Sequence, residues 1–324
     1  MIRRLLVIRF SAFGDVAMVV PTLKALALQH PEMEIMMLSK KQYAPLFEGI
    51  SNNVSFFGAD LKGEHKGIKG LNKLLNEIDF EHFDAVADIH NVLRTWYLDF
   101  RFALKGKKTA KLHKGRYAKW QLTRAMNKKK RQLTSAFERQ QDVFKRLGIE
   151  IVLHPEHNDK QNKQGIGIAP FAAHKGKIYP LERMEHLVEQ LSAKGEKIYL
   201  FGAGEKESKI LQQWADKYPN TENTANRYTM REELDMIAHL RVMLTMDSAN
   251  MHLASLVGTR VVSIWGATHP YAGFLGFGQD EQDCVQQDLP CRPCSVFGNK
   301  KCRFRDYRCL SDITTEQIIS KLDK

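Results

Sequence analysis

The sequence predicts an α/β protein with two similar domains, each a parallel sheet covered by helices. Apolar runs of strand length alternate with helical patterns over the first half of the chain, and the same alternation restarts at residue 165. The segment between them, residues 154–164, is polar and has no hydrophobic periodicity, which is typical of a linker. The length of 324 residues suits two domains of ordinary size. We therefore expect an N-terminal domain at residues 1–155 and a C-terminal domain at residues 165–324.

The N-terminal half opens with a strand, a tight loop and a helix. Residues 3–10 form an apolar run of the kind that parallel sheets bury on both faces. A loop follows at residues 11–15, and residues 16–29 have a helical pattern with Pro21 in the first turn of the main helix. The loop holds one glycine and so lacks the Gly-x-Gly-x-x-Gly fingerprint of dinucleotide-binding loops. Further strands are expected at residues 34–38, 54–57 and 83–90, and helices at residues 71–78, 92–104 and 136–147.

The C-terminal half is organised around a strand, a helix and a second strand at residues 242–265. Asp247 and Ser248 are helix-start residues, and Gly258 suits the position after a helix end. A helix over residues 250–257 therefore begins at the carboxyl end of a strand, where free backbone N–H groups bind phosphate in α/β folds. Other strands are expected at residues 165–171 and 197–201, and helices at residues 181–193, 206–218, 230–240 and 314–322. The last helix could pack back on the N-terminal domain.

Composition and charge restrict the class of protein. Apolar residues make up 43% of the chain and charged residues 27%, the mixture of a soluble globular protein. The apolar runs are too short for a transmembrane helix, and Arg9 interrupts the first of them, which argues against a signal peptide. We expect a cytoplasmic protein. The formal charge of +12 indicates an acidic partner, which could be nucleic acid, an anionic membrane or a phosphorylated substrate.

One segment concentrates this positive charge. Residues 100–137 contain many lysines and arginines and no acidic residue, whereas an ordinary solvated face mixes both signs. Tyr117 and Trp120 are interleaved with the cations, which fits a membrane interface or a nucleic acid. We expect this segment to meet an anionic partner.

Several polar residues fall at the ends of predicted strands. Asp15 follows the first strand and is either a helix N-cap or a general base. Lys177 and Asp247 follow strands of the second half, so all three residues are expected at the edges where α/β folds bind ligands. Asp88, His90 and Arg94 could line the same crevice, although a structural role is favoured for each when it is taken alone.

Four segments, taken in order, resemble motifs of the lipopolysaccharide heptosyltransferases of glycosyltransferase family 9. They are residues 9–16 (RFSAFGDV), residues 83–90 (FDAVADIH), residues 177–183 (KIYPLER), and residues 247–252 (DSANMH) with residues 266–270 (GATHP). The resemblance spans nearly the whole chain. It implies the GT-B fold, in which two Rossmann-like domains face each other across a cleft and the donor nucleotide binds mainly to the second.

The family resemblance also implies a reaction and roles for individual residues. The reaction would be an inverting transfer, without metal or cofactor, of heptose from ADP-heptose to a phosphorylated lipopolysaccharide inner-core acceptor at the inner face of the inner membrane. Asp15 would be the general base. Lys177 would hold the donor diphosphate beside the helix start. The remaining donor-binding residues would be Glu205, Asp247, Ser248, Ala249 and His252. Independently of the resemblance, the polar strand end and the basic segment lead us to expect Asp88, Arg94, Lys128, Lys129 and Lys130 to bind the acceptor.

This assignment agrees with the physical requirements of the reaction. An inverting transfer needs a base for the attacking hydroxyl and positive groups for the departing diphosphate. A lysine and a helix N-terminus can supply the second without a metal. Ala172, Ala173, Ala249 and His269 depart from residues that are common in the family, so another nucleotide sugar is an alternative donor.

Two other classes of protein compete with this interpretation. A non-enzymatic nucleic-acid-binding protein would account for the basic segment, but not for a base, a lysine and a helix start at strand ends. A nucleotide-sugar epimerase or hydrolase on the same fold would leave the basic segment without a role. We therefore expect a glycosyltransferase with an anionic membrane as partner and no nucleic acid.

The cysteines cluster late in the chain. Cys291 and Cys294 have the spacing of a metal-ligand pair, whereas Cys302 and Cys309 are too far apart for the usual second pair. Disulfides are not expected in a cytoplasmic chain. We expect free or redox-active thiols and no metal, with a four-thiolate zinc site as the alternative.

Overall fold

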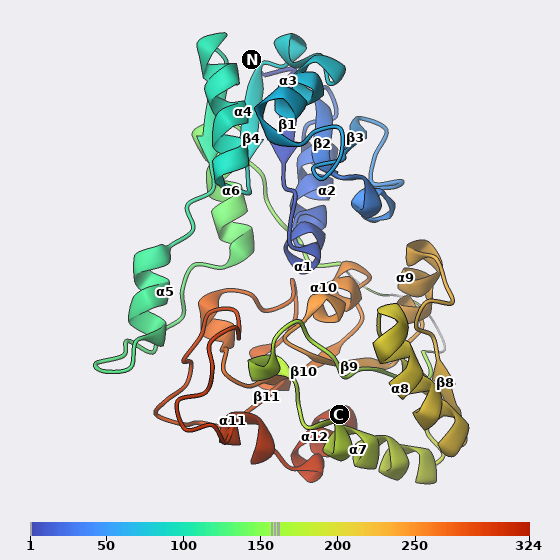
Figure 1. The fold of residues 1–324 in the computed structure, drawn as a ribbon. Coiled ribbons are helices and arrows are strands. Elements are labelled where there is room, and N and C mark those ends of the chain that lie inside the picture. The colour runs from blue at the N-terminus through green and yellow to red at the C-terminus, as the bar shows by residue number, and fades with distance from the viewer. Residues whose placement is uncertain (1, 157, 159, 161–162) are drawn as a thin grey trace. The chain divides into compact units, whose positions relative to one another are not determined.

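The computed structural model describes residues 2–156, 158, 160 and 163–324, and these divide into two compact units. The first unit comprises the residues up to Lys114 together with Ala136–His154, and the second comprises Gly115–Ser135 with Pro155–Lys324 (Figure 1). The chain passes from the first unit to the second after His154, and the earlier segment Gly115–Ser135 also belongs to the second unit. Leu133 explains this placement, because its backbone N–H donates to the Tyr271 carbonyl at 2.9 Å and its side chain packs with Leu122 and Ala272.

Within the described residues the first unit contains one parallel five-stranded sheet of order β3-β2-β1-β4-β5. Residues Leu5–Ile8 of the central strand are fully buried, as the apolar run predicts. Leu6 and Ile8 pack with apolar residues of α3 and α4 on one face of the sheet, and strand alternation directs Leu5 and Val7 to the other. The strands are β1 (Arg4–Ile8), β2 (Glu34–Lys40), β3 (Val54–Ala59), β4 (Ala85–Asp88) and β5 (Lys108–Lys111). The helices are α1 (Phe13–Ala17), α2 (Val20–Gln29), α3 (Gly67–Glu77), α4 (Leu93–Leu104) and α6 (Ala136–Arg146).

The second unit is built on a parallel six-stranded sheet, counted over the described residues, of order β11-β10-β9-β6-β7-β8. The strands are β6 (Ile166–Ala169), β7 (Ile198–Leu200), β8 (Thr221–Asn223), β9 (Val242–Met246), β10 (Val261–Trp265) and β11 (Cys284–Gln286). The helices are α5 (Arg116–Thr123), α7 (Leu181–Ala193), α8 (Gly204–Lys217), α9 (Met230–Ala238), α10 (Ala249–Leu256), α11 (Arg308–Ser311) and α12 (Thr315–Leu322). Ile318 and Leu322 of α12 join the core of the second unit beside α7.

Several elements differ from the sequence predictions: α5, α11, β5, β8 and β11 were not predicted, and the bounds of three predicted helices need correction. The helix expected over residues 16–29 is split into α1 and α2, because Pro21 lacks an N–H group and therefore lies in the first turn of a new helix. Asp15 consequently lies inside α1. The helices α3 and α8 begin four and two residues earlier than expected, and Glu205 is thereby in the first turn of α8.

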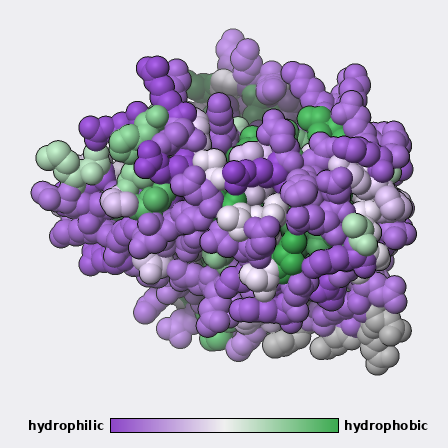
Figure 2. Space-filling model, turned by 90° about the horizontal axis from the view of Figure 1, so that it is seen from below, coloured by the Kyte–Doolittle hydropathy of each residue, from purple (hydrophilic) through white to green (hydrophobic). Residues whose placement is uncertain are grey.

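Both domains are thus parallel α/β sheets covered by helices, and the predicted fold class is confirmed. Across the part of the chain that the structure describes, no helix combines the length and the apolar composition needed to cross a bilayer. The face in Figure 2 is mostly hydrophilic, with its apolar atoms in small separate patches.

Candidate active site

In the first unit, Asp15 lies beside the carboxyl end of β1, where an arginine holds it. Arg9 Nη2 lies 2.8 Å from Asp15 Oδ2, and the Ala12 N–H donates to the same oxygen at 3.1 Å. Arg9 is itself fixed, because it donates to the backbone carbonyls of Ser11 and Ile89. The Asp15 side chain keeps 28% of its surface exposed. The carboxylate is therefore oriented by the protein and still open to a ligand.

A neutral histidine from the adjacent strand completes this part of the site. His90 follows β4, whose Asp88 pairs in register with Ile8 of β1. Burial, followed by the charge of Arg9, lowers the pKa of His90 to about 3, so the ring is uncharged near neutral pH. Its Nδ1 then accepts from the Phe10 N–H at 3.5 Å, and its Nε2 donates to Ser11 Oγ at 3.3 Å. His90 thus supports the loop that carries Ser11 and leads into α1.

The two other residues predicted for this site, Asp88 and Arg94, differ in exposure. Asp88 is fully buried and accepts from the backbone N–H groups of His90 and Asn91 and from Thr95 Oγ1. Its oxygens therefore join the end of β4 to the start of α4. Arg94 is exposed on α4. Behind them, burial and the proximity of Asp88 raise the pKa of Asp99 to about 8, and Lys111 Nζ lies 3.3 Å from its carboxyl oxygen.

In the second unit, Lys177 and Asp247 form an ion pair at the carboxyl edge of the sheet. Lys177 follows β6 and Asp247 follows β9, and these two strands are neighbours. Lys177 Nζ lies 2.8 Å from Asp247 Oδ2, and the side chains are only 16% and 6% exposed. Gly298, at φ +77°, lies against the lysine, since a Cβ there would come within 2.6 Å of Lys177 Cγ. The ammonium group is therefore closely confined.

The helix α10 begins directly after this pair. Ser248 is its N-cap residue, with Oγ 3.1 Å from Thr245 Oγ1, and Ala249 is the first helical residue. Lys177, Asp247 and the α10 N-terminus thus gather at one place, and all of them were predicted. Glu205 is exposed in the first turn of α8, after the adjacent β7, and therefore lies along the same sheet edge. His252 is buried within α10.

The basic segment makes specific contacts within the second unit. Lys128 Nζ donates to the Cys291 and Pro293 carbonyls at 2.6 Å, and burial lowers the pKa of this lysine. Lys130 pairs with Asp288. Lys129 is exposed. Two of the three lysines predicted to meet the acceptor therefore also hold the segment in place.

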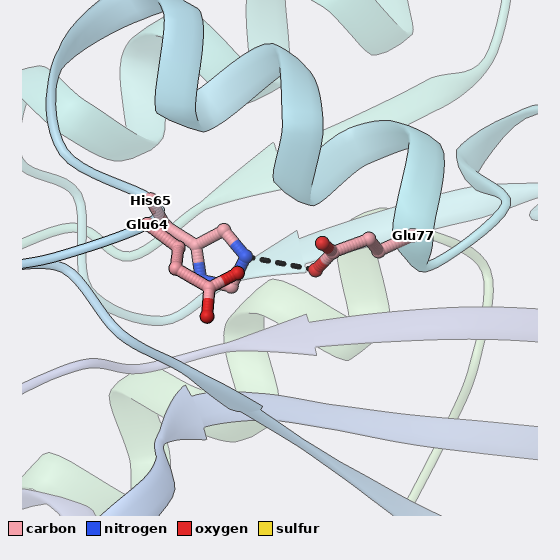
Figure 3. Close-up of side chains that lie close together, drawn as sticks. All are labelled: Glu64, His65 and Glu77. Carbon is pink, nitrogen blue, oxygen red and sulfur yellow. Dashed lines mark hydrogen bonds and ion pairs between the residues drawn. The ribbon is translucent and has the colours of Figure 1, made fainter.

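A cluster of possible metal ligands that the sequence analysis did not anticipate lies at α3. One ligand atom from each of Glu64, His65 and Glu77 falls within 4.8 Å of the others (Figure 3). His65 Nε2 lies 2.8 Å from Glu77 Oε2, while Nδ1 accepts from the Asp60 N–H at 2.9 Å. Glu64 pairs with Lys73. Because the ligand atoms of His65 and Glu64 already have protein partners, the cluster joins the 60–66 loop to α3 and is not an open metal site.

The sequence analysis did not anticipate the residues that orient the predicted side chains. Arg9 and Ser11 lie within the RFSAFGDV segment, and a cation six residues before Asp15 was a usable signal. The pairing of Lys177 with Asp247 could not be read from residues that are 70 positions apart in the chain.

Comparison with known proteins agrees with this geometry. Residues 71–305 match the family model of glycosyltransferase family 9 (heptosyltransferase). Lipooligosaccharide heptosyltransferase 2 of Campylobacter jejuni subsp. jejuni serotype O:6 is 27% identical over 131 residues, which cover 39% of this chain and 40% of that protein. The alignment thus spans about two fifths of the curated relative's length.

Solved structures of the family have the same fold. The glycosyltransferase family 9 protein of Veillonella parvula DSM 2008 has a TM-score of 0.75 at 18% identity, with 99% of this chain and 96% of that chain covered. The E. coli heptosyltransferase WaaC with ADP has a TM-score of 0.69 at 16% identity, with 99% of both chains covered. The predicted GT-B fold and the predicted family are both confirmed. The chain belongs to glycosyltransferase family 9, the heptosyltransferase family.

Proposed function

We propose that this protein is an inverting glycosyltransferase that moves heptose from ADP-heptose to a phosphorylated acceptor of the lipopolysaccharide inner core. The observation that carries the proposal is the confined Lys177 ammonium beside the N-terminus of α10. Both groups present positive charge at one sheet edge, which suits a departing diphosphate. Relatives solved with ADP and with ADP-2-deoxy-2-fluoro heptose support an ADP-linked donor.

In the proposed reaction, Asp15 takes the proton of the attacking hydroxyl. The hydroxyl oxygen forms a bond to the anomeric carbon from the face opposite the diphosphate, and the bond from that carbon to the diphosphate oxygen breaks. ADP leaves with the electron pair, so the anomeric centre is inverted. Arg9 keeps the Asp15 carboxylate in position through the 2.8 Å ion pair. Lys177 and the N–H groups of α10 stabilise the charge that grows on the diphosphate, and no metal is needed for that step.

We infer the remaining contacts to donor and acceptor from where the side chains lie in the fold. Glu205 lies in the first turn of α8, at the end of β7, where a carboxylate can accept hydrogen bonds from ribose hydroxyls. Arg94 and Lys129 are exposed cations that suit the phosphates of the acceptor or an anionic leaflet. We propose that the protein acts at the inner face of the inner membrane, and these exposed cations support that proposal.

The test is calorimetric titration with ADP, UDP and GDP. We expect ADP to bind more tightly than the other two, and Lys177→Ala to weaken ADP binding roughly tenfold or more, because a charge-assisted contact to phosphate is lost. Lys175→Ala is the matched control, since Lys175 is exposed in the same loop. Tighter binding of UDP or GDP would be consistent with a glycosyltransferase but would contradict ADP-heptose as its donor. Absence of nucleotide binding would refute the proposal.

A further inference from the structure

The second unit contains a cavity of about 460 Å³ that the proposed reaction does not use. Most of its lining residues come from α5 with its following loop and from the segment that leads into α11, two helices that Figure 1 labels. Four of the five cysteines line it: Cys291, Cys294, Cys302 and Cys309. Two aromatic side chains in its wall, Trp120 and Phe304, are 53% and 55% exposed. The cavity therefore combines an apolar wall with open access.

The wall is strongly cationic. Among the described residues, seven lysines and arginines line the cavity against a single carboxylate, Asp306, so its charge is not balanced internally. Asp306 is already paired with Arg308. Within the same described part of the chain, no carboxylate lies within 4.0 Å of Lys300, Lys301 or Arg303. These three adjacent cations are thus available to an anionic ligand.

The thiols form part of the apolar wall. Cys309 is buried, and Cys291, Cys294 and Cys302 are half-buried. Sulfurs around a tetrahedral zinc ion lie roughly 3.8 Å apart, given Zn–S bonds of about 2.3 Å. In the described residues only the group Glu64, His65 and Glu77 brings three ligand atoms within 4.8 Å, so no three of these sulfurs do so. A neutral cysteine behaves as a small apolar side chain.

We propose that this cavity binds a phosphorylated saccharide. Lys300, Lys301 and Arg303 would hold the phosphate, because ammonium and guanidinium groups form charge-assisted hydrogen bonds with it. The apolar face of the sugar ring would lie against Trp120, Phe304 and the thiols. A volume of about 460 Å³ is within the usual range for small-ligand sites. The ligand is either a free sugar phosphate or the phosphorylated sugar of the glycosyl acceptor, and the second source rests on the proposed function.

The test is calorimetric titration with mannose 6-phosphate and with mannose, at saturating ADP so that the donor site is occupied. We expect the sugar phosphate to bind and the sugar alone to bind far more weakly. The variant Lys300→Ala/Lys301→Ala/Arg303→Ala should weaken binding at least tenfold. A matched variant, Lys62→Ala/Lys66→Ala/Lys69→Ala, removes three exposed cations from the first unit and should leave binding unchanged.

Thiol labelling gives a second readout of the same site. Mannose 6-phosphate should slow alkylation of Cys294 and Cys302 by N-ethylmaleimide. Cys284 is buried outside the cavity and should label at the same rate with and without the ligand. Equal affinity in the triple variant and the wild type, or labelling that the ligand does not change, would overturn the proposal. Copurified zinc that protects all four cavity cysteines would also overturn it, in favour of a four-thiolate metal site.

Transfer kinetics separate the two sources of the ligand. A raised KM for the acceptor in the triple variant, at unchanged KM for the nucleotide sugar, assigns the cavity to the acceptor. If the triple variant loses sugar-phosphate binding but its KM for the acceptor is unchanged, the cavity is assigned to a free sugar phosphate. If no transfer occurs in any variant, the proposed function fails, while the titration still decides what the cavity binds.

Discussion

Removing the Lys177 charge should destabilise the second unit and abolish tight ADP binding together. In Lys177→Met the Asp247 carboxylate, only 6% exposed, loses the ammonium 2.8 Å away. The attraction of two unit charges at that distance is about 6 kcal/mol at an effective dielectric constant of about 20. Desolvation offsets most of this in the intact pair, but removing one partner leaves the other charge buried and costs about 3–5 kcal/mol. We therefore expect the free energy of unfolding to fall by about 3 kcal/mol.

The companion variants isolate the electrostatic part of this effect. Lys177→Met/Asp247→Asn has no buried charge at the site and should recover about 2 kcal/mol of the loss. Lys175→Met changes an exposed lysine of the same loop, whose ammonium lies 5.2 Å from the Tyr307 ring, and should cost under about 1 kcal/mol. The double variant should still bind ADP weakly, since the lysine is absent in it.

The assay is urea unfolding followed by tryptophan fluorescence, combined with calorimetric titration of ADP. Three of the four tryptophans lie in the second unit, and two of them, Trp214 and Trp265, are buried, so the signal mainly reports that unit. If Lys177→Met unfolded at the same urea concentration as the wild type, the claim that the buried Lys177–Asp247 pair stabilises the second unit would be refuted. Undiminished ADP binding in a folded Lys177→Met would refute the assignment of Lys177 to the donor diphosphate.

Three further predictions concern the first unit. Asp15→Asn should lower kcat by about 10²–10⁴-fold while the variant stays folded, and transfer at the wild-type rate would exclude Asp15 as the base. His90 has a folded pKa of about 3, below its unfolded value, so its contribution to stability is complete above about pH 6.5 and is lost as the pH falls. Between pH 6.5 and 5 the loss should be about 2 kcal/mol, and His90→Gln should show a shallower decline in urea titrations over that range. His65→Ala should destabilise the protein by about 1–3 kcal/mol, because it leaves the Asp60 N–H and Glu77 without their partner, whereas EDTA should leave the melting temperature unchanged.

The strands that sequence analysis found and missed differ in where they lie in the sheets. Central strands such as β1 and β9 are buried on both faces and must be apolar throughout, so their runs are evident. The strands β5, β8 and β11 were missed, and all three are edge strands of three or four residues. An edge strand faces solvent along one side and tolerates polar residues, as in Lys108-Thr-Ala-Lys111. Such a segment has too few buried positions to show a period.

The sequence by itself determined the fold class and indicated that Asp15, Lys177 and Asp247 follow strands, because both depend on local patterns. Burial between helices requires apolar strands, and parallel strands place the residues after them along one edge of each sheet. That is sufficient to bring Asp15 to one edge, and Lys177 and Asp247 to another. Only the tertiary structure decided which groups touch. The pairs Arg9–Asp15 and Lys177–Asp247, the inclusion of Gly115–Ser135 in the second unit and the cysteine-lined cavity arise from contacts made across the fold, many of them between residues distant in the chain. Such contacts leave no periodic signature in the sequence, since they depend on how whole elements pack.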